Sequence, residues 1–194
     1  MSGGAVRGNF GGQQIVVSGV GGQGVLFVTR LLADAAILRG EPVLTSETHG
    51  MAQRGGIVVS HLKAGAFASP LVRPGSADGL IALKDEYFSL HRGFLKPGGW
   101  IVVNSARGGA PEGGENAHAV DADGLARESG AFRSANLVLL GFALSRLGAA
   151  DHGGRLFCSP DDIREALRHR AGGKESLVAA SISALALGIL HGKR

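Results

Sequence analysis

The sequence predicts an α/β domain in three layers, in which a mixed but mostly parallel sheet lies between helices. Short β-branched segments dominate the first two-thirds of the chain, and strongly apolar helical segments occupy the last third. In addition, a glycine-rich turn joins the first strand-like segment to the first helical one, as in Rossmann-like folds. A length of 194 residues suits one domain, which we expect over residues 13–194 after a disordered, glycine-rich lead-in at 1–12.

The first elements follow from residue spacing. The β-branched run Gln14–Ser18 predicts a strand, and the apolar residues of Val25–Leu38 have the length and spacing of a helix. Val43–Glu47 predicts a second strand at the distance where a right-handed crossover would make it parallel to the first. Ile57–Leu62 predicts a third strand, which we expect to turn back through Lys63–Ser69 as a hairpin and so make the sheet mixed.

The middle of the chain continues the sheet. The wholly apolar run Gly79–Leu83 is typical of a strand covered on both faces, and a short helix over Glu86–Leu90 should follow it. The sequence of Lys96–Gly99 indicates a turn that leads into a strand at Trp100–Asn104. Five glycine and proline residues in Arg107–Asn116 favour a surface loop.

Helices complete the predicted fold. Asp121 and Asp123 should begin one helix, and Ser159, followed by Pro160, is a good N-cap for another. The apolar segments Ala135–Leu147 and Leu177–Leu190 predict helices that belong either to the core or to an interface.

Composition excludes several classes of protein. The net charge is only +4 and the chain has ten aromatic residues, so we expect no nucleic-acid partner. The apolar stretch Leu177–Leu190 is shorter than the ~20 residues of a membrane span, and residues 1–12 lack the apolar core of a secretory signal. We therefore expect a cytoplasmic protein without a membrane contact. The single cysteine, Cys158, excludes an intramolecular disulfide and a [4Fe–4S] cluster held by this chain alone.

The turn Gly19–Gly24 matches the pattern G-x-G-x-x-G between a strand and a helix. Such a turn exposes backbone N–H groups that can bind a phosphate or another anion, although the same glycines could simply let the helix pack close to the sheet. Glu47 stands 23 positions after Gly24, where a dinucleotide-binding fold places the acid that binds ribose. A stand-alone NAD(P)-binding protein is therefore one hypothesis.

A polar segment follows the second predicted strand. It brings Glu47, His49, Gln53 and Arg54 into one short stretch rich in turn residues. Arg54 could bind a carboxylate or phosphate there, or the segment could dock a partner chain. The alternative is a solvated loop with an ordinary Arg–Glu pair.

The two segments Gly19–Val25 and Ser46–Gly56 together closely resemble the small subunit of the 2-oxoacid:ferredoxin oxidoreductases. Within that family, the motif His-Gly-Met-Ala-Gln-Arg-Gly-Gly is most similar to the corresponding segment of the beta subunit of the indolepyruvate enzymes. Further matches are Ala82-Leu83, Leu95–Gly99 and Ser134–Gly141, so the resemblance covers most of the chain.

The resemblance implies a fold like domain III of pyruvate:ferredoxin oxidoreductase and an accessory role. A large alpha subunit would carry thiamine diphosphate and the [4Fe–4S] clusters, while this chain alone binds no cofactor and is inactive. The complex would decarboxylate arylpyruvates oxidatively to aryl-acetyl-CoA, with coenzyme A as co-substrate and ferredoxin as the electron acceptor. Alternatively, the chain would be the gamma subunit of an enzyme for pyruvate, branched-chain oxoacids or 2-oxoglutarate.

The resemblance assigns no catalytic residue. It implies instead a set of residues at an interface or along the approach of coenzyme A: Gly19, Gly21, Gly22, Gln23, Gly24, Glu47, His49, Gln53, Arg54 and Asn136. The seven histidines show no metal-ligand spacing, so we expect no metal site. Cys158 precedes a helix N-cap, which could lower its pKa, but a role as a small buried hydrophobe is favoured.

Overall fold

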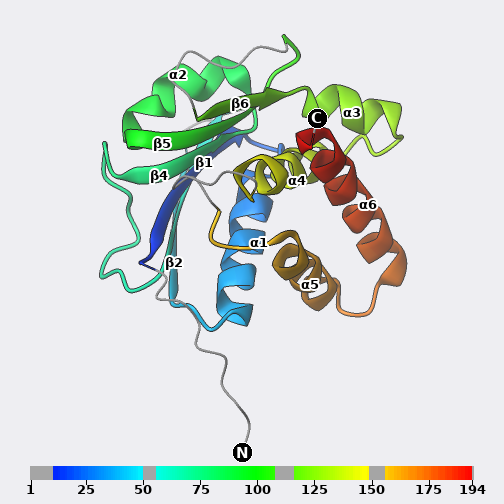
Figure 1. The fold of residues 1–194 in the computed structure, drawn as a ribbon, viewed down its shortest axis with the longest axis horizontal. Helices are drawn as coiled ribbons and strands as arrows, with labels where there is room; N and C mark the ends of the chain where they lie inside the picture. The colour runs from blue at the N-terminus through cyan, green and yellow to red at the C-terminus, as the bar shows by residue number, and fades with distance from the viewer. Residues whose placement is uncertain (1–10, 50–55, 108–115, 149–155, 194) are drawn as a thin grey trace, which may run out of the picture.

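The computed structural model describes residues 11–49, 56–107, 116–148 and 156–193. Six strands form one sheet in the order β2-β3-β1-β4-β5-β6 (Figure 1). Their bounds are β1 Gln13–Val20, β2 Val43–His49, β3 Ile57–Ala64, β4 Ala77–Ala82, β5 Leu95–Asn104 and β6 Ala117–Val120. The first element begins at residue 13, while the expected disordered lead-in falls mostly outside the described residues.

The sheet is mixed, as expected, but for a different reason. β3 pairs antiparallel with both β1 and β2, whereas β1, β4, β5 and β6 pair in parallel. The predicted hairpin through Lys63–Ser69 is wrong, because β1 and β2 occupy both edges of β3 and leave none for a following strand. Because β3 lies between β1 and β2 and is antiparallel to both, β2 runs parallel to β1 as predicted but is not its neighbour.

Helices occupy most of the remaining described chain. Their bounds are α1 Val25–Leu38, α2 Phe88–His91, α3 Ala122–Glu128, α4 Ala135–Gly148, α5 Pro160–Ala171 and α6 Glu175–Gly192, with 3₁₀ turns at Asp85–Tyr87 and Arg92–Phe94. The predicted bounds of α1 are confirmed, and Asp121 and Ser159 cap α3 and α5 through their side chains. The predicted turn at Lys96–Gly99 lies inside β5, where the register with β4 shifts. The short strand β6 was not predicted.

Alternate residues of the central strands pack on opposite faces of the sheet. Ile15 and Val17 of β1 face α1 and α4, which α5 and α6 cover from outside, whereas Val16 faces the short helical segment 85–94 (Figure 1). Trp100 is buried on the side of the long helices, and a Cβ at Gly79 would overlap its ring. Both faces of the central sheet are therefore buried, as the apolar run Gly79–Leu83 predicted.

Helix α6 packs on α4 through glycines. A Cβ at Gly188 would overlap the carbonyl oxygen of Val138, and one at Gly141 would overlap that of Leu185. Within the described residues, α6 is also the one helix long and apolar enough to cross a membrane by length and composition, with 22% of that segment buried. Core helices of soluble proteins pass the same test, and the contacts with α4 make α6 a packed part of this domain.

Two buried histidines lie where β3 packs against the short helical segment 85–94: His61 belongs to the strand and His91 to α2. The ring of His61 on β3 meets that of Phe94 edge-on at 5.3 Å between centroids, and His91 stacks on the same ring at 6.5 Å. Burial holds the pKa of His61 below its ordinary value, with the charges of Lys63 and His91 adding to the effect. Burial also lowers the pKa of His91, although a hydrogen bond with the backbone of Tyr87 opposes this.

These histidines predict acid sensitivity. As the pH falls below about 6.5, the unfolded chain takes up protons that the folded histidines do not, so the folded state loses stability that it has above this pH. We expect the free energy of unfolding, measured by urea denaturation, to fall between pH 7.5 and 5.5. The variant His61→Gln should lose less stability over this interval, and an unchanged loss would contradict the assignment.

Candidate functional site

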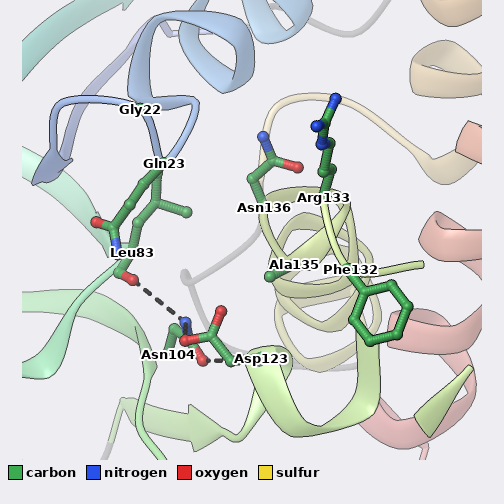
Figure 2. A pocket seen from close by; sticks show the side chains of 9 residues that line it. All are labelled: Gly22, Gln23, Leu83, Asn104, Asp123, Phe132, Arg133, Ala135 and Asn136. Carbon is green, nitrogen blue, oxygen red and sulfur yellow. Dashed lines mark hydrogen bonds between the residues drawn. The ribbon is translucent and has the colours of Figure 1, made fainter. Parts of the chain in front are cut away.

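A pocket of about 380 Å³ opens at the carboxyl ends of the parallel strands. It lies where the strand order reverses, because the chain continues from β1 towards the β2 edge and from β4 towards the β6 edge. This is the place where doubly wound α/β folds bind ligands. The lining residues are Gly22, Gln23, Leu83, Asn104, Asp123, Phe132, Arg133, Ala135 and Asn136 (Figure 2).

The glycine turn forms one wall of the pocket. The N–H group of Val20 donates to Oε1 of Gln23 at 2.8 Å, which closes the turn. A Cβ at Gly19 would lie 2.8 Å from the same oxygen, so a larger residue there would displace Gln23. Gly21 donates its N–H to the carbonyl of Gly56 at 3.0 Å and so joins the turn to the beginning of β3.

Gly24 brings two helix N-termini together. It is the N-cap of α1 with φ +88°, and a Cβ at this position would overlap Nδ2 of Asn136 near the start of α4. The Oδ1 atom of Asn136 accepts the N–H of Leu137 at 2.8 Å. The contact therefore holds α1 and α4 at a fixed distance beside the pocket.

Asn104 organises the floor of the pocket at the end of β5. Its Nδ2 donates to the carbonyl of Leu83 at 3.2 Å and to Oδ2 of Asp123 at 2.9 Å, as Figure 2 shows. Its Oδ1 accepts the N–H of Ala122 at 2.9 Å. Because this buried side chain joins β4, β5 and α3, it fixes where the carboxylate of Asp123 lies.

The rim of the pocket carries a cation and an aromatic ring. Arg133 and Asn136 extend on the same side of the start of α4, while the ring of Phe132, which is 72% exposed, points away from them (Figure 2). Together with Asp123 and the amide of Gln23, these groups can bind a ligand that has anionic and hydrogen-bonding parts.

The structure brings together only part of the predicted site. Gly22, Gln23 and Asn136 line the pocket, and Gly19, Gly21 and Gly24 shape the turn behind it. Gln53, Arg54 and the side chain of His49 lie outside the described residues. Sequence reasoning missed Asn104, Arg133 and Phe132; a polar residue at the end of a buried strand was the signal that could have found Asn104.

The structure does not support the dinucleotide arrangement. Glu47 lies on β2 and is separated from the glycine turn by the whole of β3, whereas an acid that binds ribose needs a strand next to β1. The Glu47 carboxylate is instead 3.6 Å from Arg30 of α1.

Two further points of the sequence analysis concern a metal site and the role of Cys158. Among the described residues, no three His, Cys, Asp or Glu side chains are grouped so that they could hold a metal ion. Cys158 is buried, and burial raises the pKa of its thiol well above the usual range, so the favoured role as a small hydrophobe is confirmed.

The contact between Gly24 and Asn136 yields a prediction for the site. Replacing Gly24 by alanine forces an L residue into the left-handed region, at a cost of about 1–2 kcal/mol, and displaces Asn136. We expect Gly24→Ala to unfold at a lower urea concentration than the wild type. Adding Asn136→Ala to this variant should restore the stability lost through overlap with the Asn136 side chain, but not the stability lost through the left-handed φ at position 24. Full recovery of the urea midpoint, or no recovery, would contradict this division into two costs.

Fold and pocket together define a doubly wound α/β domain with a pocket at its topological switch point. Residues 14–190 match the family model for pyruvate ferredoxin/flavodoxin oxidoreductase. The chain belongs to this family, as the resemblance in its sequence predicted, and it resembles the family's small subunits.

Two curated relatives are indolepyruvate oxidoreductase subunits IorB. The protein of Archaeoglobus fulgidus is 43% identical over 93 residues, which span 48% of this chain and 46% of that protein. The protein of Thermococcus kodakarensis is 33% identical over 155 residues, or 68% of this chain and 76% of the relative. The match thus spans about half the length of the first relative and three-quarters of the second.

Two solved structures have the same fold, each with a TM-score of 0.72 and 26% identity. One is the gamma subunit of a keto/oxoacid ferredoxin oxidoreductase from Geobacter sulfurreducens; the match covers 93% of this chain and 98% of that one. The other is the 2-oxoglutarate:ferredoxin oxidoreductase of Magnetococcus marinus with 2-oxoglutarate, coenzyme A and succinyl-CoA bound, where the match covers 94% of this chain but 31% of that one. The fold therefore occurs both as a whole subunit and as about a third of a longer chain.

Proposed function

We propose that this chain is the small subunit of a cytoplasmic, thiamine-dependent oxidoreductase that converts indolepyruvate and related arylpyruvates to aryl-acetyl-CoA and reduces ferredoxin. The observation that carries the proposal is the similarity to two indolepyruvate oxidoreductase subunits, at 43% and 33% identity. The family match over residues 14–190 supports the reaction class, and the substrate rests on these relatives.

The side chains support a division of labour within the complex. A [4Fe–4S] cluster needs about four thiolates, whereas this sequence has one cysteine, Cys158, and its side chain is buried. In the proposed complex the large subunit carries the clusters and, as the family resemblance implies, thiamine diphosphate, which supplies the decarboxylation chemistry when bound. The pocket of this chain, with Arg133, Gln23 and Asn136, suits a role beside those cofactors, in binding coenzyme A or orienting the partner.

The proposal is tested by assembling the enzyme. The chain is expressed with and without its large subunit, and ferredoxin reduction is measured with indolepyruvate, phenylpyruvate, pyruvate, 2-oxoglutarate and a branched-chain oxoacid in the presence of coenzyme A. We expect activity only when both subunits are present, with a higher kcat/KM for the arylpyruvates than for the other oxoacids. Activity of the isolated small chain, or preference for another oxoacid, would overturn the proposal.

A further inference from the structure

The carboxylate of Asp123 presents one oxygen to the pocket. Its Oδ2 accepts a hydrogen bond from Nδ2 of Asn104 at 2.9 Å. Within the described residues Oδ1 accepts none, and Figure 2 shows the carboxylate directed into the space between Gln23 and Asn136. Because Asn104 is buried and is itself bonded to the backbone of β4 and α3, this oxygen has a fixed position. A ligand in the pocket must therefore offer it an N–H or O–H donor.

Positive charge lies at the other end of the pocket. Arg133 is exposed at the start of α4 and forms no ion pair with the rest of the described chain. Figure 2 shows its guanidinium group pointing away from Asp123. Between these two charges the lining includes the apolar residues Leu83 and Ala135 and the backbone of Gly22. The arrangement suits a ligand with a donor at one end, a flat body and an anion at the other end.

Coenzyme A has its parts in this order. Its adenine ring carries a 6-amino group, and the phosphates follow on the ribose side of the ring. The reverse placement would bring the ribose phosphate next to the Asp123 carboxylate, where like charges repel. The thiol end must reach the thiamine cofactor of the large subunit, so it cannot occupy the floor of a pocket in this chain. The adenine end is the part that the floor can accept.

An oxoacid fits the same pocket less well. Its carboxylate is the group that leaves as carbon dioxide at the thiamine cofactor, whereas Arg133 would hold that carboxylate on the small subunit. The volume of about 380 Å³ is near the lower end of the range for ligand pockets, which suits one part of coenzyme A and not the whole molecule.

We infer that Asp123 determines specificity for the adenine group of coenzyme A, by accepting a hydrogen bond from the 6-amino group through Oδ1. The inference rests on the proposed function in taking coenzyme A as a substrate of the complex. A hydrogen bond to a charged acceptor is among the stronger ones. An analogue without the amino group leaves the carboxylate oxygen unpaired in the pocket, so the site should discriminate against it.

The test compares coenzyme A with an analogue that has purine in place of adenine and so lacks the amino group. The Kd of each compound is measured by titration calorimetry on the assembled complex without oxoacid, and kcat/KM is measured with the oxoacid that the complex prefers. The wild type should favour coenzyme A by roughly 10-fold or more in both quantities.

The variant Asp123→Asn should exchange this specificity. Its amide oxygen can still accept the hydrogen bond from Asn104, which leaves the NH₂ group towards the pocket. The preference for coenzyme A over the purine analogue should fall below about threefold. The same variant should favour an analogue with hypoxanthine, whose 6-oxo group accepts from the new NH₂ group. The thermal midpoint of the free variant should stay close to that of the wild type.

Two control variants separate this role from general effects. Asp121→Asn makes the same chemical change next to the same helix, but Asp121 caps α3 and does not line the pocket, so the wild-type preference should remain. Arg133→Gln should raise the Kd of coenzyme A and of the purine analogue by the same factor, because both carry the same phosphates.

Equal affinity of the wild type for the two compounds would overturn the inference, and so would an undiminished preference in Asp123→Asn. An equal loss of affinity for both compounds in Asp123→Asn would also overturn it, since that result indicates a structural role. A preference of the complex for pyruvate would overturn the proposed substrate but not the role of Asp123. Arylpyruvate oxidation without discrimination between the two compounds would do the reverse, and an enzyme that does not use coenzyme A would overturn both.

Discussion

Gly188→Val should destabilise the isolated chain by about 3 kcal/mol or more, the largest effect that we expect from one substitution. A Cβ at this position would overlap the carbonyl oxygen of Val138 and lie 2.8 Å from the N atom of Phe142, so α6 must move away from α4. Domains of this size have a total stability of about 5–15 kcal/mol, so much of it would be lost. The measurement is the free energy of unfolding in urea.

Ala186→Val is the matched control, since it adds a valine to the same helix at an exposed position. It should cost less than about 1 kcal/mol, the usual penalty of a β-branched residue in a helix. Equal effects of the two substitutions would show that helix propensity, and not the contact between α4 and α6, determines the result.

Asn104→Leu should lower the stability by about 3 kcal/mol and also impair the assembled enzyme. The change keeps the approximate size of the side chain but removes its hydrogen bonds to Leu83, Ala122 and Asp123, each worth about 1 kcal/mol. The carboxylate of Asp123 then loses its fixed position in the pocket. We expect a lower urea midpoint and a reduced kcat/KM for coenzyme A or the oxoacid.

Asn116→Leu provides the comparison for this substitution. The side chain of Asn116 donates an exposed hydrogen bond to the carbonyl of Gly98. Its replacement should cost less than about 1 kcal/mol and leave the activity unchanged. If both variants behave alike, Asn104 does not organise the pocket.

The local pattern predicted most of the elements because their determinants lie within each segment. The spacing of apolar residues in Val25–Leu38 is that of one buried helix face, and Ser159 with Asp162 forms a capping box that needs no distant residue. The glycine turn was likewise readable from its pattern, and its φ values at Gly22 and Gly24 are positive, as close backbone turns require.

Strand pairing depends on more than the local pattern. The direction of β2 followed from its distance to β1, but its neighbour is β3, which comes later in the chain. This pairing rests on contacts between segments that are far apart in the chain, and no single segment encodes those contacts. The error over the hairpin after Lys63 and the failure of Glu47 as a ribose-binding acid both have this cause.

The sequence by itself thus determined the fold class, the bounds of α1, the N-caps of α3 and α5, the glycine turn and, with the family resemblance, the kind of enzyme complex. Only the tertiary structure decided that Asn104, Asp123 and Arg133 meet that turn in one pocket, because the contacts join segments more than 80 residues from Gly22. The tertiary structure also decided which side of α6 is exposed. Apolar spacing shows that a helix has a side to bury, but the packing partner of the helix decides which side remains exposed.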